Sequence, residues 1–440
     1  MKFSNVIVRT SLIVAVVLSL VLSFIIWTNN QYFDNHTNDT KNVAVTKETN
    51  TVINNTYLPT EALYNADKSQ TVQIYDKTRN VPLELSKKLS KIKLSALKIV
   101  VGSKGRYEDL LHDTKYIQLV YPDKVTVGTI ANVSKINGKI RLASRKVNRI
   151  FIPVSGKGKI FFGEDEQRAL LSTDISKTPI NGIMQIIKTA DQKINVSLHM
   201  IGSQYCAFYE AGTKIGVYSY LTSNQTESYY VSRLLGVSNV ESKENEGIAT
   251  YSSGPYQKII VDRSKNIFSY NNYDDNIVPK NSTQLFSRSS QYLEKSGLTL
   301  NEMRYFENND NQISYRYFVE GLPVFLEADN SAAINIDYTN GGTNLSFKNI
   351  IFQIPIPMDG REKAIQSTAK LLKEIEAKGV QRDDIQRIEL GFKVVHDQEN
   401  EKLVDLEPTM YFKIFNQWKD TDSWLESDIA LAKRTLSGVK

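Results

Sequence analysis

The stretch Ser11–Trp27, SLIVAVVLSLVLSFIIW, decides how the rest of the chain is placed. It contains seventeen residues without a charge, and a helix of that length spans most of a bilayer core of roughly 30 Å. Lys2 and Arg9 precede it, and no basic residue follows before Lys41. This charge asymmetry predicts a single-pass anchor within residues 1–28, a cytoplasmic N-terminus and an extracytoplasmic remainder, so we expect the protein at the cell membrane.

A cleavable signal peptide is the alternative interpretation of this stretch, because it also begins with basic residues followed by an apolar run. Cleavage requires small residues just past the apolar run. Here the run ends in Phe24-Ile25-Ile26-Trp27 and continues as polar Thr28-Asn29-Asn30-Gln31. A tryptophan at this position is typical of an interfacial anchor, which favours a retained helix.

Small residues recur at every fourth position of the apolar stretch, at Ser11, Ala15, Ser19 and Ser23. Positions four apart drift only slowly around a helix, so these residues form a strip on one face. Such strips let a second membrane helix approach closely. We therefore predict that they form a partner-binding face, with chance placement of small residues as the alternative.

Positive charge is concentrated in the first part of the predicted ectodomain. The segment Asp76–Arg168 contains 20 Lys and Arg against 9 Asp and Glu, a local charge of +11 where the whole chain has +6. Outside a membrane, the polyanions that such a surface meets are lipid headgroups and anionic wall polymers. A solvated lysine-rich face is the alternative. Nucleic acid is not predicted, because no Gly-rich aromatic motif of an RNA-binding protein accompanies the charge.

The single cysteine, Cys206, excludes an intrachain disulfide. It lies in the apolar and aromatic run Tyr205–Tyr209, which predicts a buried, unreactive thiol. The stability of this exported chain is therefore expected to come from packing rather than from covalent crosslinks.

Hydrophobic periodicity predicts an α+β, multi-domain ectodomain behind a flexible stalk. Residues 29–55 are polar and lack periodicity, as a stalk does. Residues 56–200 then predict a basic α+β domain, 201–279 a middle domain of one helix and an antiparallel meander, and 280–440 a C-terminal domain with two such units.

Three amphipathic helices organise the helix-plus-meander units. The first two are predicted over Glu227–Leu235 and Ser282–Ser296, and each is followed by a glycine, as helix C-termini commonly are. The third is predicted over Gly360–Lys378, with Asp359 as its N-cap. Alternating apolar residues follow each helix, which predicts antiparallel strands.

Catalytic chemistry is not indicated by any motif. Matches to S-x-x-K at Ser90/Lys93, Ser95/Lys98 and Ser437/Lys440 occur without the S-D-N or K-T-G elements that would accompany them in a penicillin-binding enzyme. The four histidines lack zinc-ligand spacing. We therefore predict a protein that is not an enzyme, with no catalytic or metal-binding residues and no cofactor.

Two further segments suggest a family. The segment Tyr315–Phe325, YRYFVEGLPVF, and the ending Leu406–Tyr411, LEPTMY, before Trp418 follow an anchor that ends in Trp27. In this order they resemble the YycH family, and the resemblance extends over nearly the whole chain. YycH proteins are membrane-anchored regulators of the WalK/WalR (YycG/YycF) two-component system, which controls cell-wall metabolism in low-GC Gram-positive bacteria, and they are not known as enzymes.

This resemblance implies an ectodomain of PepSY-like modules, also seen in the partner family YycI, and contacts with both YycI and the sensor histidine kinase WalK. It carries over no residue-level binding signature. The expected function is therefore a non-enzymatic extracytoplasmic regulator of the kinase. The alternative is a membrane-anchored extracytoplasmic cell-wall peptidase or peptidase inhibitor.

Overall fold

The computed structural model describes Ser19 and residues 55–89, 96–133, 142–175, 179–236, 239–298, 302–326, 332–356, 360–400 and 402–436. The chain divides into two compact units, Met1–Glu48 and Thr49–Lys440. Of the first unit only Ser19 is described, as helical and exposed. No described helix is long and apolar enough to cross a membrane. The anchor predicted within residues 1–28 lies, apart from Ser19, outside the described residues and stays a prediction.

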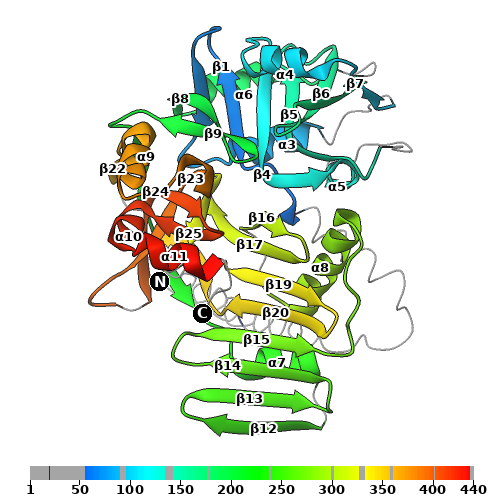
Figure 1. Cartoon of the computed structure of the whole chain (residues 1–440), viewed down its shortest axis with the longest axis vertical. Coiled ribbons are helices and arrows are strands. Elements are labelled where there is room, and N and C mark those ends of the chain that lie inside the picture. The colour runs from blue at the N-terminus through cyan, green and yellow to red at the C-terminus, as the bar shows by residue number, and fades with distance from the viewer. Residues whose placement is uncertain are drawn as a thin grey trace, which may run out of the picture. The chain divides into compact units, whose positions relative to one another are not determined.

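Nine antiparallel strands among the described residues form the first sheet of the unit 49–440 (Figure 1). The central strands of this sheet pack side chains on both faces, since β2 is buried at every position and β5 at every position but its first. Across the sheet the order is β3 (Lys98–Ile99), β7 (Ala169–Asp174), β6 (Lys159–Glu164), β5 (Lys146–Pro153), β4 (Tyr116–Thr126), β1 (Glu61–Asn65), β2 (Thr71–Tyr75), β8 (Gln192–Ile201) and β9 (Gln204–Tyr209).

Short helices supply the apolar surface that covers this sheet. Helix α3 buries Val81, Leu85 and Leu89, which are four residues apart and therefore share one face. Helix α4 places Tyr107 edge-on against Phe151 of β5 in a separate small core. The described helices in this part of the chain are α3 (Val81–Leu89), α4 (Ser103–Leu111), α5 (Val127–Val133) and α6 (Ile183–Thr189).

The second half of the chain forms one larger sheet, with fourteen strands among the described residues. Its pairs are antiparallel except for β18 with β23, which run parallel. Its strands are β11 (Tyr218–Ser223), β12 (Val240–Asn245), β13 (Ile248–Ser253), β14 (Gln257–Asp262), β15 (Ile267–Asn272), β16 (Met303–Asn309), β17 (Gln312–Val319), β18 (Leu322–Phe325), β19 (Ile334–Thr339), β20 (Gly342–Lys348), β21 (Ile351–Ile356), β23 (Ile385–His396), β24 (Leu403–Ile414) and β25 (Gln417–Asp420).

The first two helices of the predicted helix-plus-meander units are confirmed. Helix α7 spans Glu227–Leu235, and α8 spans Ser282–Ser296. Asn281 caps α8 by accepting a hydrogen bond from the backbone N–H of Gln284. Gly297 ends α8 with a φ of 67°, a left-handed conformation that glycine adopts without a steric penalty. Local signals therefore suffice to set the limits of these helices.

The third predicted helix, Gly360–Lys378, was wrong in its first part. Residues Glu362–Ala364 form strand β22, which pairs with β10 (Lys214–Gly216), and helix α9 spans only Thr368–Ala377. Pairing with a strand about 150 residues away in the sequence overrides the local helical pattern. Asp359, the predicted N-cap, lies outside the described residues.

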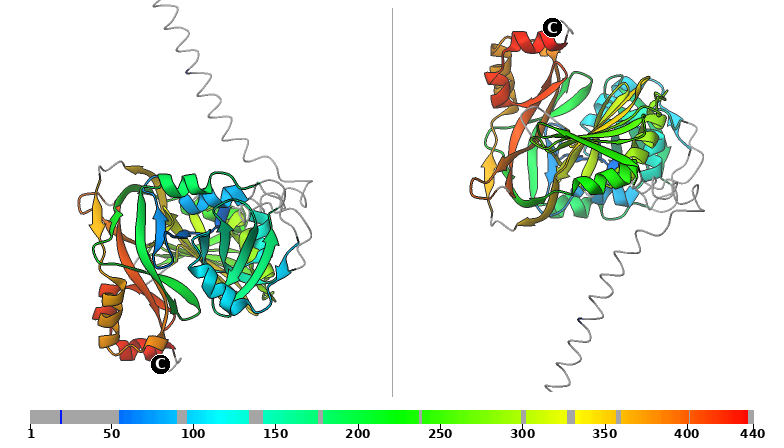
Figure 2. Two further views of the ribbon diagram at one scale, coloured as in Figure 1. Left: turned by 90° about the horizontal axis from the view of Figure 1, so that it is seen from above. Right: turned by 90° about the horizontal axis from the view of Figure 1, so that it is seen from below.

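Two more helices close the described C-terminal end, α10 (Thr421–Glu426) and α11 (Ile429–Leu436). In both views of Figure 2 they lie together with α9 beside the last strands. The α+β class, rich in sheet and with few helices, is thereby confirmed. The PepSY-like character of the modules and the domain limits at 200 and 279 stay predictions.

A buried ion pair fixes the interior of the first sheet. Arg149 of β5 and Asp165, just after β6, are both fully buried, with the Arg149 Nε 3.1 Å from the Asp165 Oδ1. The Asp165 carboxylate also accepts hydrogen bonds from Asn148 Nδ2 at 2.9 Å, from the backbone N–H of Tyr205 at 3.0 Å and from the hydroxyl of Tyr107. One carboxylate therefore joins two strands of the sheet, helix α4 and the edge strand β9.

We expect Asp165→Ala to destabilise the unit 49–440 by about 3–5 kcal/mol, because it leaves the Arg149 guanidinium buried without its partner. The measurement is the urea-denaturation midpoint followed by circular dichroism. The matched control is Asp174→Ala, since Asp174 is half-buried at the end of β7 and has no ion pair within the described part of the chain. Equal losses of stability in the two variants would contradict the role of the ion pair between Arg149 and Asp165.

The Asp165 carboxylate also makes the stability of the unit 49–440 depend on pH in the acid range. Burial alone would raise the pKa of Asp165, but the charge of Arg149 and the hydrogen bonds from Arg149, Tyr107 and Tyr205 hold this pKa below its ordinary value. A lowered folded-state pKa contributes stability above the ordinary Asp pKa of about 3.9, and this contribution is lost as the pH falls through the folded-state value. The free energy of unfolding of Asp165→Asn, measured by urea denaturation across this pH range, should therefore lack this part of the pH dependence.

Candidate functional site

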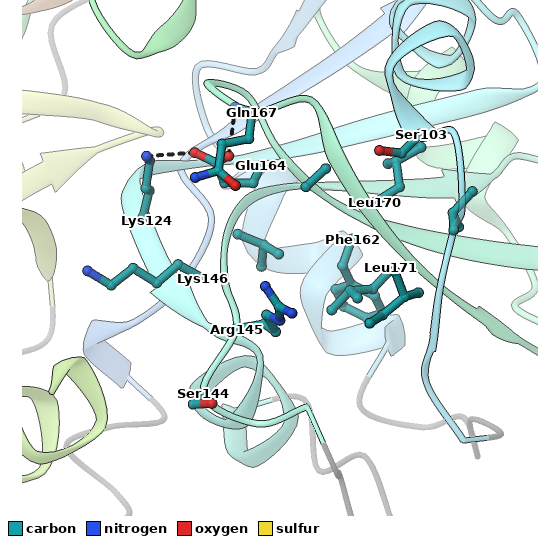
Figure 3. A pocket seen from close by; sticks show the side chains of 14 residues that line it. Ser103, Lys124, Ser144, Arg145, Lys146, Phe162, Glu164, Gln167, Leu170 and Leu171 are labelled. Carbon is teal, nitrogen blue, oxygen red and sulfur yellow. Dashed lines mark hydrogen bonds and ion pairs between the residues drawn. The ribbon is translucent and has the colours of Figure 1, made fainter.

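A pocket of about 350 Å³ opens at the edge of the first sheet, between the short strand β3 and strands β4 to β7 (Figure 3). Strand order explains its position, because β3 and β7 form one end of the sheet and β3 contains only two residues. A second hollow, of about 190 Å³, lies in the larger sheet and is lined by polar residues that include Glu307 and Lys413. The first has the larger volume and an apolar floor.

The floor of the edge pocket is made by apolar side chains from four strands and the residue after β3. Phe162 of β6 and Leu171 of β7 are register partners, so their side chains lie together on one face of the sheet. Both are buried, as is Val147 of β5. The apolar lining residues are Ile99, Val100, Val147, Phe162, Ala169, Leu170 and Leu171.

One wall carries a lysine that is already paired. The Nζ of Lys124 lies 2.6 Å from Glu164 Oε1 and 2.5 Å from Glu166 Oε2. The other oxygen of Glu164 accepts the backbone N–H of Gln167 at 2.8 Å. Burial alone would lower the pKa of Lys124, but its hydrogen bonds to the two carboxylates raise it above its ordinary value. Lys124 therefore shares its one positive charge between two carboxylates, and this wall carries no free cation among the described residues.

Two further cations stand at the mouth. Arg145 and Lys146 are exposed residues at the start of β5, and both line the pocket. Figure 3 shows Lys146 on the side of Lys124, Phe162 and Leu171 on the other side, and Arg145 between them. Within the residues that the structure describes, neither cation has a carboxylate within 4.0 Å. The mouth therefore carries positive charge that no described carboxylate pairs with.

Of the residues predicted as a partner-binding strip, the structure describes only Ser19. Ser11, Ala15 and Ser23 lie outside the described residues, and Ser19 is helical and exposed in the other compact unit. The strip therefore stays a prediction. Sequence reasoning missed the pocket, although the excess of positive charge over 76–168 includes the cations at its mouth. Five strands build the pocket, so no contiguous motif marks it.

Side chains with potential chemistry lie elsewhere and are inert or isolated. Cys206 is buried, as predicted, and burial raises the pKa of its thiol to about 12. His199 lies 2.9 Å from the hydroxyl of Ser197 and against the ring of Phe208 on β8 and β9. Across the described ranges, no group of three His, Cys, Asp or Glu side chains could hold a metal ion.

Asp275 holds a helix in place rather than a ligand. Its carboxylate accepts hydrogen bonds from Arg288 and, at 2.5 Å, from the hydroxyl of Tyr292, both on α8. It therefore anchors helix α8 to the loop that follows β15. This is a structural contact, and no ligand is needed to explain it.

We expect the thiol of Cys206 to be protected in the native unit. With a pKa of about 12, its thiolate fraction at pH 8 is lower than that of an ordinary cysteine by a factor on the order of a thousand. Labelling with an alkylating reagent should therefore be slower by at least that factor than labelling in urea. Native labelling within tenfold of the rate in urea would show that β9 opens readily.

The described residues define a sheet-rich α+β protein with a ligand-sized pocket and without a metal-ligand group. Comparison with protein-family models then identifies its family. The family model for the YycH protein N-terminal domain matches residues 7–192, and that for the YycH protein C-terminal domain matches residues 217–428. The chain belongs to the YycH family.

A solved structure agrees with this assignment at the level of the fold. The crystal structure of YycH from Bacillus subtilis is similar with a TM-score of 0.66 and 14% sequence identity, over 84% of this chain and 96% of that one. Comparison with curated proteins gives no match. Membership of the YycH family supports a role in regulating the YycG/WalK two-component system, in a family of regulatory proteins that are not known as enzymes.

Proposed function

We propose that this protein is a non-enzymatic extracytoplasmic regulator that binds the membrane sensor histidine kinase WalK, together with a YycI-type membrane protein, and thereby modulates signalling that controls cell-wall metabolism. The observation that carries this proposal is the family match, which extends over both halves of the chain, residues 7–192 and 217–428. The single uncharged stretch Ser11–Trp27 supports a location in the same membrane as the kinase.

The proposed mechanism is a shift of population. A partner that binds one conformation of the kinase more tightly than the other biases the equilibrium by that difference in affinity and needs no chemistry of its own. Anchoring in the same membrane raises the effective concentration of the two proteins without any new contact. A mainly structural ectodomain with a buried, unreactive thiol is compatible with this role.

The direct test is co-purification of the full chain with the kinase and the YycI-type protein in detergent, followed by phosphotransfer assays. We expect a complex and a changed level of kinase phosphorylation in its presence. No complex and no change would contradict the proposal. Hydrolysis of peptidoglycan or peptides by the unit 49–440, abolished by one Ser or His substitution, would favour the alternative of a cell-wall peptidase.

The strip in the predicted anchor gives a sharper prediction. Ala15→Leu with Ser19→Leu should retain membrane insertion, because both changes add apolar surface, but should weaken co-purification by at least about threefold. That factor corresponds to one lost interhelical hydrogen bond of roughly 0.6 kcal/mol, before any steric effect. The matched control is Val17→Leu with Val21→Leu on the opposite face. Equal effects from both double substitutions would show that the helix serves only as a tether.

The basic segment 76–168 gives a further testable prediction. If its charge of +11 faces anionic lipid or an anionic wall polymer, binding of the unit 49–440 to anionic vesicles or wall material should weaken as salt shortens the screening length from about 10 Å at 0.1 M. Zwitterionic vesicles are the control. Binding that did not depend on ionic strength would favour a merely solvated lysine-rich face.

A further inference from the structure

The edge pocket of the first sheet combines an apolar interior with a mouth whose two cations have no carboxylate partner among the described residues. Its volume of about 350 Å³ lies at the lower end of the range of roughly 300–1,000 Å³ in which proteins hold small molecules. The side chains of Val147, Phe162 and Leu171 form its apolar floor. A ligand that fills this space therefore gains from placing a hydrocarbon part against it.

The charge of the ligand follows from which charged groups are already paired. Glu164, a carboxylate that lines the pocket, is already paired with Lys124 through Oε1 and accepts the backbone N–H of Gln167 through Oε2. Arg145 and Lys146 at the mouth have no carboxylate partner in the described part of the chain. A guanidinium presents paired N–H donors that fit a carboxylate or a phosphate, and a neighbouring ammonium adds a second charge.

Apolar surface continues outward from the pocket along the edge strand. Ile99 of β3 is 56% exposed, and Val101, two residues later, is 94% exposed. Lys98 and Ile99 pair with β7 on one side only, since β3 ends the sheet. Exposed aliphatic side chains at the lip of an apolar pocket would extend the surface available to a hydrocarbon chain.

We propose that this pocket binds a small amphiphilic anion, with a carboxylate or phosphate head held by Arg145 and Lys146 and a hydrocarbon chain lying on Val147, Phe162 and Leu171 toward Ile99. A free amphiphile and the anionic head of a membrane lipid share this chemistry. Its residues are not those of the predicted membrane strip, and the proposal does not depend on binding to the kinase.

The wall of the pocket lies next to residues that contact the second sheet. Lys124 follows Asp123, whose carboxylate accepts the hydroxyl of Tyr305 at 3.1 Å and the backbone N–H of Asn308 at 3.0 Å, both on β16. The carbonyl oxygen of Lys124 accepts the same hydroxyl of Tyr305 at 3.3 Å. A ligand that orders this part of β4 therefore acts on residues that join the two sheets.

The test uses the unit 49–440, which contains its own core and every described strand, in the absence of detergent. Decyl phosphate below its micelle concentration is the probe, with decyltrimethylammonium, inorganic phosphate and vesicles containing phosphatidylglycerol as the other arms. Calorimetry gives the affinity, and a rise in melting temperature with probe concentration gives an independent reading, because a ligand that binds only the folded state stabilises it.

Arg145→Gln with Lys146→Gln should weaken decyl phosphate binding at least tenfold. The matched control, Lys157→Gln with Lys159→Gln, removes the same charge from two exposed lysines of the same sheet outside the pocket lining and should leave the affinity unchanged. Ala169→Phe, which fills the pocket from β7, should also abolish binding. Protection of Cys206 from alkylation shows whether each variant is folded.

Each outcome decides the proposal. Binding of decyl phosphate that the mouth variant weakens, while the control does not, supports a free amphiphile as ligand. Binding of phosphatidylglycerol vesicles alone, with the same dependence on the mouth variant, supports a lipid head as the source. Equal affinity for decyltrimethylammonium, equal loss in the two charge variants, unchanged binding in folded Ala169→Phe, or no binding of any anionic amphiphile would overturn it.

Discussion

The buried carboxylate of Asp165 is the constraint on which the first half of the structure depends. A charge in this interior is unfavourable unless hydrogen bonds and an opposite charge compensate for lost hydration, and Arg149, Asn148, Tyr107 and the backbone of Tyr205 together do so. Since these partners come from strand β5, helix α4 and the edge strand β9, the ion pair selects one arrangement of them. It also fixes the turn after β6, and with it the wall of the edge pocket.

Specific hydrogen bonds, and not apolar packing alone, join the two sheets. The hydroxyls of Tyr57 and Tyr315 lie 2.7 Å apart in the interior, and Asp123 of β4 holds Tyr305 and Asn308 of β16. Buried polar contacts of this kind are unfavourable when mismatched, so they favour a single register between the sheets. Strand β4 thereby connects the pocket of the first sheet to the second sheet.

A regulator acts on its partner through the surfaces and states that its fold makes available. Among the described residues, the thiol of Cys206 is buried, and the carboxylates of Asp165 and Asp275 are occupied by structural hydrogen bonds. At the mouth of the pocket, Arg145 and Lys146 have no carboxylate partner within the described ranges. A binding event there, or along a membrane helix, can bias a partner only by its differential affinity for that partner's states.

Local sequence determined the features whose signals are contiguous: helices α7 and α8 with the glycines that follow them, the burial of Cys206, and the α+β class. The membrane strip also rests on sequence alone. Only the tertiary structure decided that Glu362–Ala364 is a strand and that Asp275 anchors α8, because both depend on partners distant in the sequence. It likewise decided the pocket, since Lys124, Arg145 and Phe162 meet only through strand order, which local periodicity does not encode.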